Sequence, residues 1–171
     1  KLTDVQTNTD YYYRVGSTTQ IQATGSEYYF KTADPVGSKQ KIRIWAMGDM
    51  GSGTPNQLSV RDAYMNSIKN NNRATDLVLL LGDNAYGTGN DEEYQNNFFN
   101  VYQNHFLKNN VLWAIPGNHE YYSGDQNKRE VSFFKVFSFP QTGEAGGEPS
   151  GTKMYYSLDY ANVHLVGLDS H

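Results

Sequence analysis

Three short segments of the sequence combine glycine with side chains that can bind a metal ion or move a proton. They are Gly48-Asp49-Met50-Gly51, Gly82-Asp83-Asn84-Ala85-Tyr86 and Gly117-Asn118-His119-Glu120. Two carboxylates, a phenol and a carboxamide form a hard, oxygen-rich donor set, which suits Fe(III), Mn(II), Zn(II) or Mg(II) rather than soft metals. A carboxylate that bridges two such ions about 3.5–4 Å apart lets one ion generate hydroxide while the other holds a substrate oxygen. Such a two-metal arrangement would serve in-line attack on phosphorus.

The spacing of the segments indicates that they share one edge of a sheet. Asp83 follows Asp49 by 34 residues (83 − 49), and Asn118 follows Asp83 by 35 (118 − 83). Each interval fits one strand-helix-strand unit of about 30 or more residues. Parallel strands end at the same edge, where ligands bind in open α/β sheets. We therefore expect the three segments to form one site.

The strands that must position these residues are predicted from residue 37 onward, in alternation with helices. Asp76–Leu81 is a continuous apolar run, typical of a strand that is buried on both faces. Lys41–Ala46 and Val111–Ile115 are predicted to be its neighbours. The alternation of strand and helix indicates an α/β unit.

Two helices are predicted between the strands. Thr54-Pro55 is an N-cap and N1 pair that opens the first helix, with Leu58, Met65 and Ile68 facing inward. The second helix has acidic residues in its first turn, aromatic residues on one face and a lysine at its end. Its defining residues are Asp91, Glu92, Glu93, Tyr94, Phe98, Val101, Tyr102, Phe106 and Lys108.

Residues 1–36 are predicted to be an all-β unit with its linker, separate from the α/β unit of residues 37–171. Tyr11–Val15 and Glu27–Lys31 are predicted as short strands, and alternate residues of the first would share a buried face. The first strand and its approach resemble the strand entry of fibronectin type III domains, in which a tyrosine corner fixes the turn. Two strands alone are marginal in water, so we expect the C-terminal part of such a domain.

The last part of the chain is predicted to be a long loop followed by a hairpin. Residues 123–153 are polar and rich in glycine, apart from an aromatic segment around Phe133–Phe139, and loops of this length often lie beside active sites. Met154–Tyr160 and Asn162–Asp169 are predicted as the two hairpin strands.

The three glycine-containing segments, in this order and spacing, resemble the first three of five motif blocks of the metallophosphoesterases, and within them the purple acid phosphatases. Tyr86 is the residue that distinguishes the purple acid phosphatases in this comparison, because related calcineurin-like phosphatases and nucleases usually lack this tyrosine. The resemblance implies the N-terminal βαβαβ half of a metallophosphoesterase-type β-sandwich flanked by helices, preceded by a truncated fibronectin III-like segment. It also implies an acid phosphatase that hydrolyses small phosphate monoesters.

A dinuclear metal centre of Fe(III) with a divalent ion (Fe, Zn or Mn) follows from the same resemblance. Asp49 would bind the first metal, as would Tyr86 through its phenolate, while Asp83 would bridge the two ions and Asn118 would bind the second. Further histidine ligands belong to the fourth and fifth blocks, which would lie beyond His171. We therefore expect the chain of 171 residues to be inactive alone and the intact protein to be active.

His119 and Glu120 are the catalytic residues that the resemblance implies. Metal-bound hydroxide would attack in line, and His119 would lie over the phosphate, stabilise the developing charge and help to protonate the leaving oxygen. Glu120 would support it. The other histidines within the sequence, His105 and His164, are predicted to be structural, and Asp169 is predicted to be a cap or a supporting residue.

Composition excludes several other functions. The formal net charge of −4 without clustered Lys or Arg argues against nucleic acid or an anionic membrane as a main partner. The absence of cysteine excludes thiol nucleophiles and thiolate metal sites. No apolar run approaches the about 20 residues of a membrane span, and no signal-peptide pattern is present. A secreted or periplasmic location is therefore implied by the resemblance alone, and the oligomeric state is left open.

The sequence leaves open two alternatives to the phosphatase function. One is a surface module without catalytic activity that binds a carbohydrate or a protein, indicated by the missing histidine blocks and the aromatic run Tyr11–Tyr13. The other is a colourless phosphodiesterase or nucleotidase relative. Metal analysis and the sequence that follows His171 would separate them.

Overall fold

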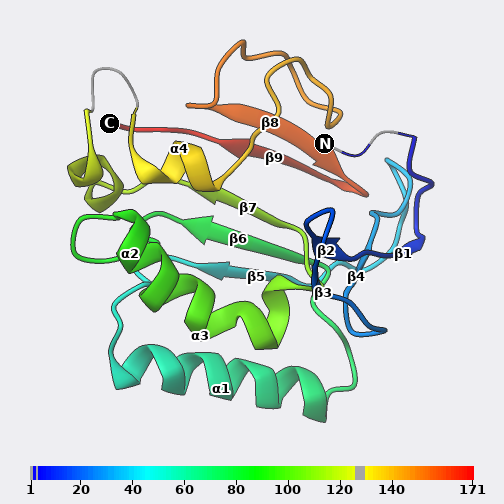
Figure 1. The fold of residues 1–171 in the computed structure, drawn as a ribbon. Coiled ribbons are helices and arrows are strands. Elements are labelled where there is room, and N and C mark those ends of the chain that lie inside the picture. The colour runs from blue at the N-terminus through cyan, green and yellow to red at the C-terminus, as the bar shows by residue number, and fades with distance from the viewer. Residues whose placement is uncertain (1, 3, 126–129) are drawn as a thin grey trace.

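The central element of the structure, a computed structural model that describes residues 2, 4–125 and 130–171, is a parallel sheet of three strands. The strands are β5 (Ile44–Met47), β6 (Leu77–Leu81) and β7 (Leu112–Ile115), in the order β5-β6-β7 (Figure 1). Leu77, Val78 and Leu80 are buried, whereas Leu81 at the end of β6 is 52% exposed. The predicted parallel strands and α/β class are confirmed, but burial of the middle strand on both faces does not extend to its last residue.

The first helix, α1 (Pro55–Asn70), begins at the predicted Pro55 and packs on the sheet through an unexpected face. Tyr64 stacks on Trp45 of β5 with ring centroids 3.8 Å apart, and Gln57 is buried. Leu58 is 41% exposed, so its predicted inward position is wrong. Positions 57 and 64 lie two turns apart on one helix face, and the polar contacts of Gln57 with the neighbouring helical layer select this face over the one with Leu58.

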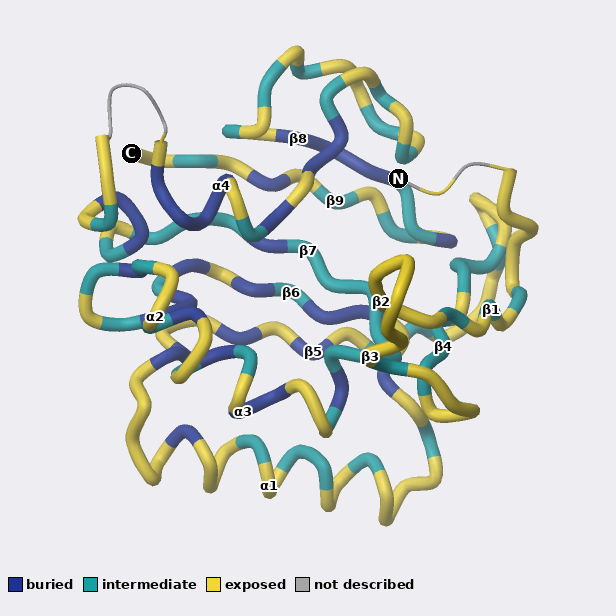
Figure 2. Tube along the Cα trace, viewed as in Figure 1, coloured by how far each residue is buried: buried dark blue, intermediate teal, exposed yellow. Residues whose placement is uncertain are grey.

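The second helical span covers the predicted residues but is not one regular α-helix. It consists of α2 (Asp91–Glu93), a π-helical segment (Tyr94–Phe99), α3 (Asn100–Tyr102) and a second π-helical segment (Gln103–Leu107). Asn90 and Glu93 form a capping box at its start. The predicted apolar face is confirmed, because all five of its residues are buried in the core (Figure 2): Tyr94, Phe98, Val101, Tyr102 and Phe106.

The N-terminal unit contains two short antiparallel pairs, where two strands were predicted. β1 (Asp10–Tyr12) pairs with β4 (Tyr29–Lys31), and β2 (Val15–Gly16) pairs with β3 (Ile21–Ala23). The predicted strand Tyr11–Val15 is thus divided, and Val15, expected on its buried face, is 51% exposed. The Tyr11 hydroxyl accepts a hydrogen bond from the Gln6 backbone N–H at 2.8 Å, which fixes the turn before β1.

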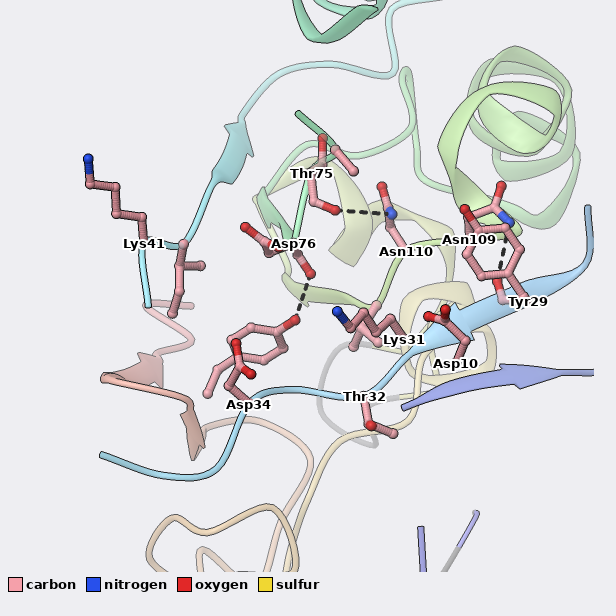
Figure 3. Close-up of a pocket in the computed structure, with 14 residues that line it drawn as sticks. Asp10, Tyr29, Lys31, Thr32, Asp34, Lys41, Thr75, Asp76, Asn109 and Asn110 are labelled. Atoms are coloured by element: carbon pink, nitrogen blue, oxygen red, sulfur yellow. Dashed lines mark hydrogen bonds between the residues drawn. The ribbon is translucent and has the colours of Figure 1, made fainter. Parts of the chain in front are cut away.

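This N-terminal unit lies at the amino ends of the parallel strands. The Tyr13 hydroxyl donates to the Lys108 carbonyl at 2.8 Å, and the Asn109 side chain donates to the carbonyls of Glu27 and Tyr29 at 2.7 and 3.2 Å. A polar pocket lies at this junction, lined by β4 and by the segments before β6 and β7 (Figure 3). The carboxyl ends of the strands are at the opposite end of the sheet (Figure 1).

A hairpin of β8 (Tyr156–Tyr160) and β9 (Val163–Gly167) follows the long loop and confirms the predicted strand pair. The Tyr156 hydroxyl donates to the Ala114 carbonyl of β7 at 2.8 Å, which ties the hairpin to the central sheet. The aromatic segment of the loop forms a short helix, α4 (Ser132–Val136), that was not predicted. None of the helices in the described part of the chain combines the length and apolar character that crossing a bilayer requires.

Candidate metal centre

Asp49 and Asp83 turn out of neighbouring strands at the same edge of the sheet. Both directly follow a strand-end glycine, and both have left-handed backbone conformations, with φ of 54° and 50°. Aspartate and asparagine tolerate this region better than other residues that carry a β-carbon. The backbone N–H of Asp49 donates to the Gly82 carbonyl at 3.1 Å, which holds the two turns side by side.

The hydroxyl of Tyr86 joins these two carboxylates. It lies 2.5 Å from Asp49 Oδ1 and 2.8 Å from Asp83 Oδ2. Two carboxylate oxygens from neighbouring strand ends therefore meet at one phenol oxygen. In the described part of the chain neither carboxylate has a Lys, Arg or His ion-pair partner. Concentrated negative charge without a basic partner, in a hard oxygen donor set, fits a multivalent cation.

The acidity of Tyr86 depends on this environment. Burial raises the pKa of its hydroxyl above the usual value of 10.0, and the hydrogen bonds and negative charges of Asp49 and Asp83 raise it further. A cation bound among the same oxygens would act in the opposite direction, because it favours the phenolate. The protein alone therefore holds Tyr86 as a neutral phenol.

Two glycines are required by the close packing of the strand-end loops. A β-carbon on Gly117 would lie 2.2 Å from Asp83 Oδ1, and one on Gly51 would lie 2.0 Å from the Asn84 carbonyl oxygen. Both distances are far inside van der Waals contact. The glycines of the first and third segments therefore allow close approach of the loops to the second.

His119 lies beside the Tyr86 ring, with ring centroids 4.5 Å apart. Its backbone N–H donates to Asp83 Oδ1 at 3.1 Å, and its Nδ1 is 2.5 Å from the Gly87 carbonyl oxygen. Because a carbonyl can only accept, Nδ1 carries a proton. Nε2 is therefore the ring nitrogen that can exchange a proton or a hydrogen bond with a ligand.

Asn118 precedes His119 at the rim of the site. It is exposed, and its side-chain amide donates to the Tyr122 hydroxyl at 3.4 Å. The structure therefore brings Asp49, Asp83, Tyr86 and His119 into direct contact, and places Asn118 next to them along the chain. Among the described residues, His, Asp and Glu side chains do not gather in threes at ligating positions, so the donor group here is two carboxylates and a phenol.

Glu120 lies behind the loops rather than at their surface. Its side chain is fully buried, and its carboxylate accepts hydrogen bonds from backbone N–H groups of the second and third segments. Burial raises the pKa of Glu120, the amides of Gly117, Asn84 and Ala85 oppose this shift, and the charge of Asp83 adds to it.

Sequence reasoning missed two residues that support the second segment. The Glu93 carboxylate accepts from the backbone N–H groups of Gly87 and Thr88 at 2.6 and 2.8 Å. The Asn97 side chain donates to the Tyr86 carbonyl at 2.8 Å. The three-residue spacing of Asn90 and Glu93 at a helix start is the sequence signal that could have indicated the capping role of Glu93.

The histidines predicted to be structural lie outside this group of contacts. Burial and the nearby Arg61 lower the pKa of His105, against a smaller opposing effect of Asp62. His164 Nδ1 is 2.7 Å from Asp159 Oδ1 across the β8–β9 hairpin. Asp169 accepts a hydrogen bond from the Tyr121 hydroxyl, in keeping with a supporting position.

The parallel sheet and the oxygen donors at its carboxyl edge together define an α/β fold with a candidate metal-binding edge. The family model of the calcineurin-like phosphoesterases matches residues 42–166, so the chain belongs to this family. The match begins just before β5 and ends within β9. Membership implies a dinuclear metal centre.

Individual relatives are acid phosphatases by name. Purple acid phosphatase 21 of Arabidopsis thaliana is 30% identical over 172 aligned residues, which cover 100% of this chain and 35% of the plant protein. Tartrate-resistant acid phosphatase type 5 of Homo sapiens is 32% identical over 94 residues, 50% of this chain and 29% of the human protein. The same enzyme of Rattus norvegicus is 33% identical over 89 residues, 47% of this chain and 27% of the rat protein. The chain thus spans about a third of the length of these relatives.

Proposed function

We propose that this chain is part of an acid phosphatase of the purple acid phosphatase type, which hydrolyses small phosphate monoesters with a dinuclear metal centre. The observation that carries the proposal is the Tyr86 hydroxyl within 2.8 Å of two strand-end carboxylates, Asp49 and Asp83. A phenol in this position distinguishes the purple acid phosphatases in the motif resemblance, and relatives carrying that name or the name acid phosphatase match this chain.

Four residues would hold the metals. Asp49 and Tyr86 would bind the first ion, which we propose to be Fe(III), Asp83 would bridge, and Asn118 would bind a second ion of Fe, Zn or Mn. Cations bound there would supply Lewis-acid polarisation of a phosphoryl oxygen and a nucleophile. Because this set is short of the usual number of ligands, further histidines from the sequence after His171 are part of the proposal.

His119 would act on the substrate. The Gly87 carbonyl holds Nδ1–H and orients the ring beside Tyr86, so Nε2 is the nitrogen that faces an incoming phosphate. From there it would donate a hydrogen bond to a phosphoryl oxygen and pass a proton to the leaving oxygen. We propose secretion or a periplasmic location, with no nucleic acid or membrane partner, and little activity in the 171-residue chain alone.

The test uses the complete gene product that contains this chain, loaded with iron and a divalent metal. We expect it to hydrolyse p-nitrophenyl phosphate, best in acid, and to absorb visible light through charge transfer from Tyr86 to iron. Hydrolysis of phosphodiesters or nucleotides without colour would assign it to a colourless relative. A metal-loaded protein with neither hydrolysis nor colour would overturn the proposal and favour a binding module.

A further inference from the structure

We propose that Glu120 is a positioning residue whose buried carboxylate fixes the loop after β6, which carries Asp83, to the loop after β7, which carries Asn118. Glu93 fixes the far end of the loop after β6 in the same way. The proposal concerns the metal ligands of the function proposed above and rests on that function. It also revises the expectation that Glu120 supports catalysis at the phosphate.

The Glu120 carboxylate binds backbone N–H groups of two loops at once. Oε1 accepts from Asn84 at 2.7 Å and from Ala85 at 3.3 Å. Oε2 accepts from Asp83 at 3.0 Å and from Gly117 at 2.6 Å. Hydrogen bonds to an ionised acceptor are shorter and stronger than neutral ones. One side chain therefore joins the loop after β6 to the loop after β7.

The geometry separates Glu120 from the reacting groups. The N–H of Asp83 points to Glu120, whereas the side chain of Asp83 contacts the Tyr86 hydroxyl and the His119 N–H. The backbone of Asp83 thus lies between Glu120 and the oxygen donors. On its inner side Glu120 contacts the buried Tyr94 hydroxyl at 3.3 Å, so its carboxylate is enclosed and cannot reach a substrate.

Glu93 performs the same task at the other end of the loop. It accepts from the N–H of Gly87 at 2.6 Å, while the carbonyl of Gly87 binds Nδ1 of His119 at 2.5 Å. Its other oxygen accepts from the N–H groups of Thr88 and Asn90 at 2.8 and 3.1 Å. The segment from Asp83 to Asn90 is thus held at both ends by carboxylates, and within this segment they accept only from backbone N–H groups and the Thr88 hydroxyl. Between these anchors the loop presents Tyr86 to Asp49.

The first experiment compares Glu120→Gln with the wild type in the complete gene product. Glutamine has the same size but directs an NH₂ group at N–H donors, so it loses about half of the contacts. We expect Zn(II) or Mn(II) affinity, measured by equilibrium dialysis, to fall about ten- to hundredfold, as for residues that orient metal ligands. In iron-loaded protein we expect a shifted or weakened visible band, kcat restored toward wild type by excess metal, and little change in KM.

A second pair of variants covers the case in which Glu120→Gln does not fold. Glu93→Gln removes the charge at the far end of the loop and is expected to lower metal affinity in the same direction. Glu92→Gln, its exposed neighbour in α2, is the matched control and should behave as wild type. Equal metal affinities for Glu93→Gln and Glu92→Gln would contradict the proposal.

The outcomes distinguish this proposal from the function on which it rests. Wild-type protein that binds metal but hydrolyses no phosphate ester would refute the function, while the affinity comparison would still decide the positioning role. Variants that bind metal as wild type does and lose only kcat, with a changed pH profile, would make Glu120 a proton-transfer residue and overturn the positioning role. Wild-type protein that binds no metal would overturn both.

Discussion

The oxygen atoms of Asp49, Asp83 and Tyr86 meet through direct side-chain contacts between these three residues. Each aspartate adopts a left-handed conformation directly after a strand, and the phenol spans the space between their carboxylates. At this scale a change of one functional group alters the donor set without altering the fold, so each donor can be tested by itself.

Tyr86→Phe tests the phenol. Because the ring is retained, we expect folding stability of the metal-free protein to change by about 1 kcal/mol or less. In the metal-loaded gene product the visible absorption should disappear, and kcat/KM should fall at least about tenfold through loss of the proposed phenolate ligand. Absorption spectra and p-nitrophenyl phosphate assays check both. Retained colour would place the chromophore elsewhere.

Gly117→Ala tests the close approach of two strand ends. The new β-carbon would meet the Asp83 backbone nitrogen at 2.4 Å as well as its Oδ1 at 2.2 Å, so the loops must separate. We expect a loss of about 1–3 kcal/mol in the free energy of unfolding, measured in urea. Gly48→Ala is the control, because its β-carbon would lie 3.5 Å from Leu81 in ordinary contact. Equal stabilities for the two variants would show that the loops tolerate the separation.

The convergence of the two aspartates was predictable from residue type and spacing, and the contacts that support them were not. Glycine followed by Asp at strand ends one βαβ unit apart predicted that Asp49 and Asp83 would lie at one edge, which the structure confirms. The Glu120 contacts were not predictable, because they join its side chain to backbone groups more than 30 residues earlier, and no sequence pattern marks such a pair.

At the scale of elements, the apolar pattern predicted which face of the second helical span is buried but not its helix type. The aromatic stripe of residues 94–106 predicted the buried face, and this is confirmed. The pattern could not indicate the π-helical turns, because the apolar spacing is compatible with a regular α-helix. It also favoured Leu58 over Gln57, since hydropathy alone does not anticipate that a buried glutamine amide finds the Asn97 carbonyl at 2.6 Å.

The start of α2 is expected to make stability depend on pH. Burial of Glu93 opposes ionisation, but the backbone N–H groups of Thr88, Asn90 and Gly87 outweigh it and lower the pKa below its usual value of 4.5. The ionised form therefore stabilises the fold above about pH 4.5, and this contribution is lost as the pH falls through the lowered pKa.

Urea unfolding of metal-free protein checks this dependence. Glu93→Gln should be less stable than wild type by about 1 kcal/mol near pH 6, through weakening of the capping box. The difference should shrink as the pH falls below 4.5. The Glu92→Gln control should show no such pH-dependent difference. A constant gap at all pH values would mean that ionisation of Glu93 does not contribute.

At the scale of the whole molecule, the N-terminal unit and the candidate metal centre occupy opposite ends of the central sheet (Figure 1). The resemblance of the first 36 residues to a fibronectin III-like segment stays a prediction. The extra pair β2-β3 was not predicted, because Ile21–Ala23 is too short and polar to stand out from its surroundings. The contacts that hold the unit in place are separated by more than 80 residues along the chain, and local sequence does not reveal them.

Asn109→Ala tests the junction between the N-terminal unit and the sheet. The change removes two hydrogen bonds, to Glu27 and Tyr29, and should cost about 1–2 kcal/mol. We expect faster amide hydrogen exchange in β4 and unchanged exchange in β6. Asn66→Ala on the exposed side of α1 is the control. Unchanged exchange in β4 would show that other contacts hold the junction.

Because the N-terminal unit and the candidate metal centre lie at opposite ends of the sheet, a label can be attached to the N-terminal unit without covering the centre. These 171 residues contain no cysteine, so Ser26→Cys in the exposed turn before β4 would introduce a unique thiol within them, in the N-terminal unit. A dye or a solid support coupled there by maleimide chemistry would leave the candidate metal centre facing the solution. Coupling at this position would therefore fix the orientation of the protein in surface-bound assays.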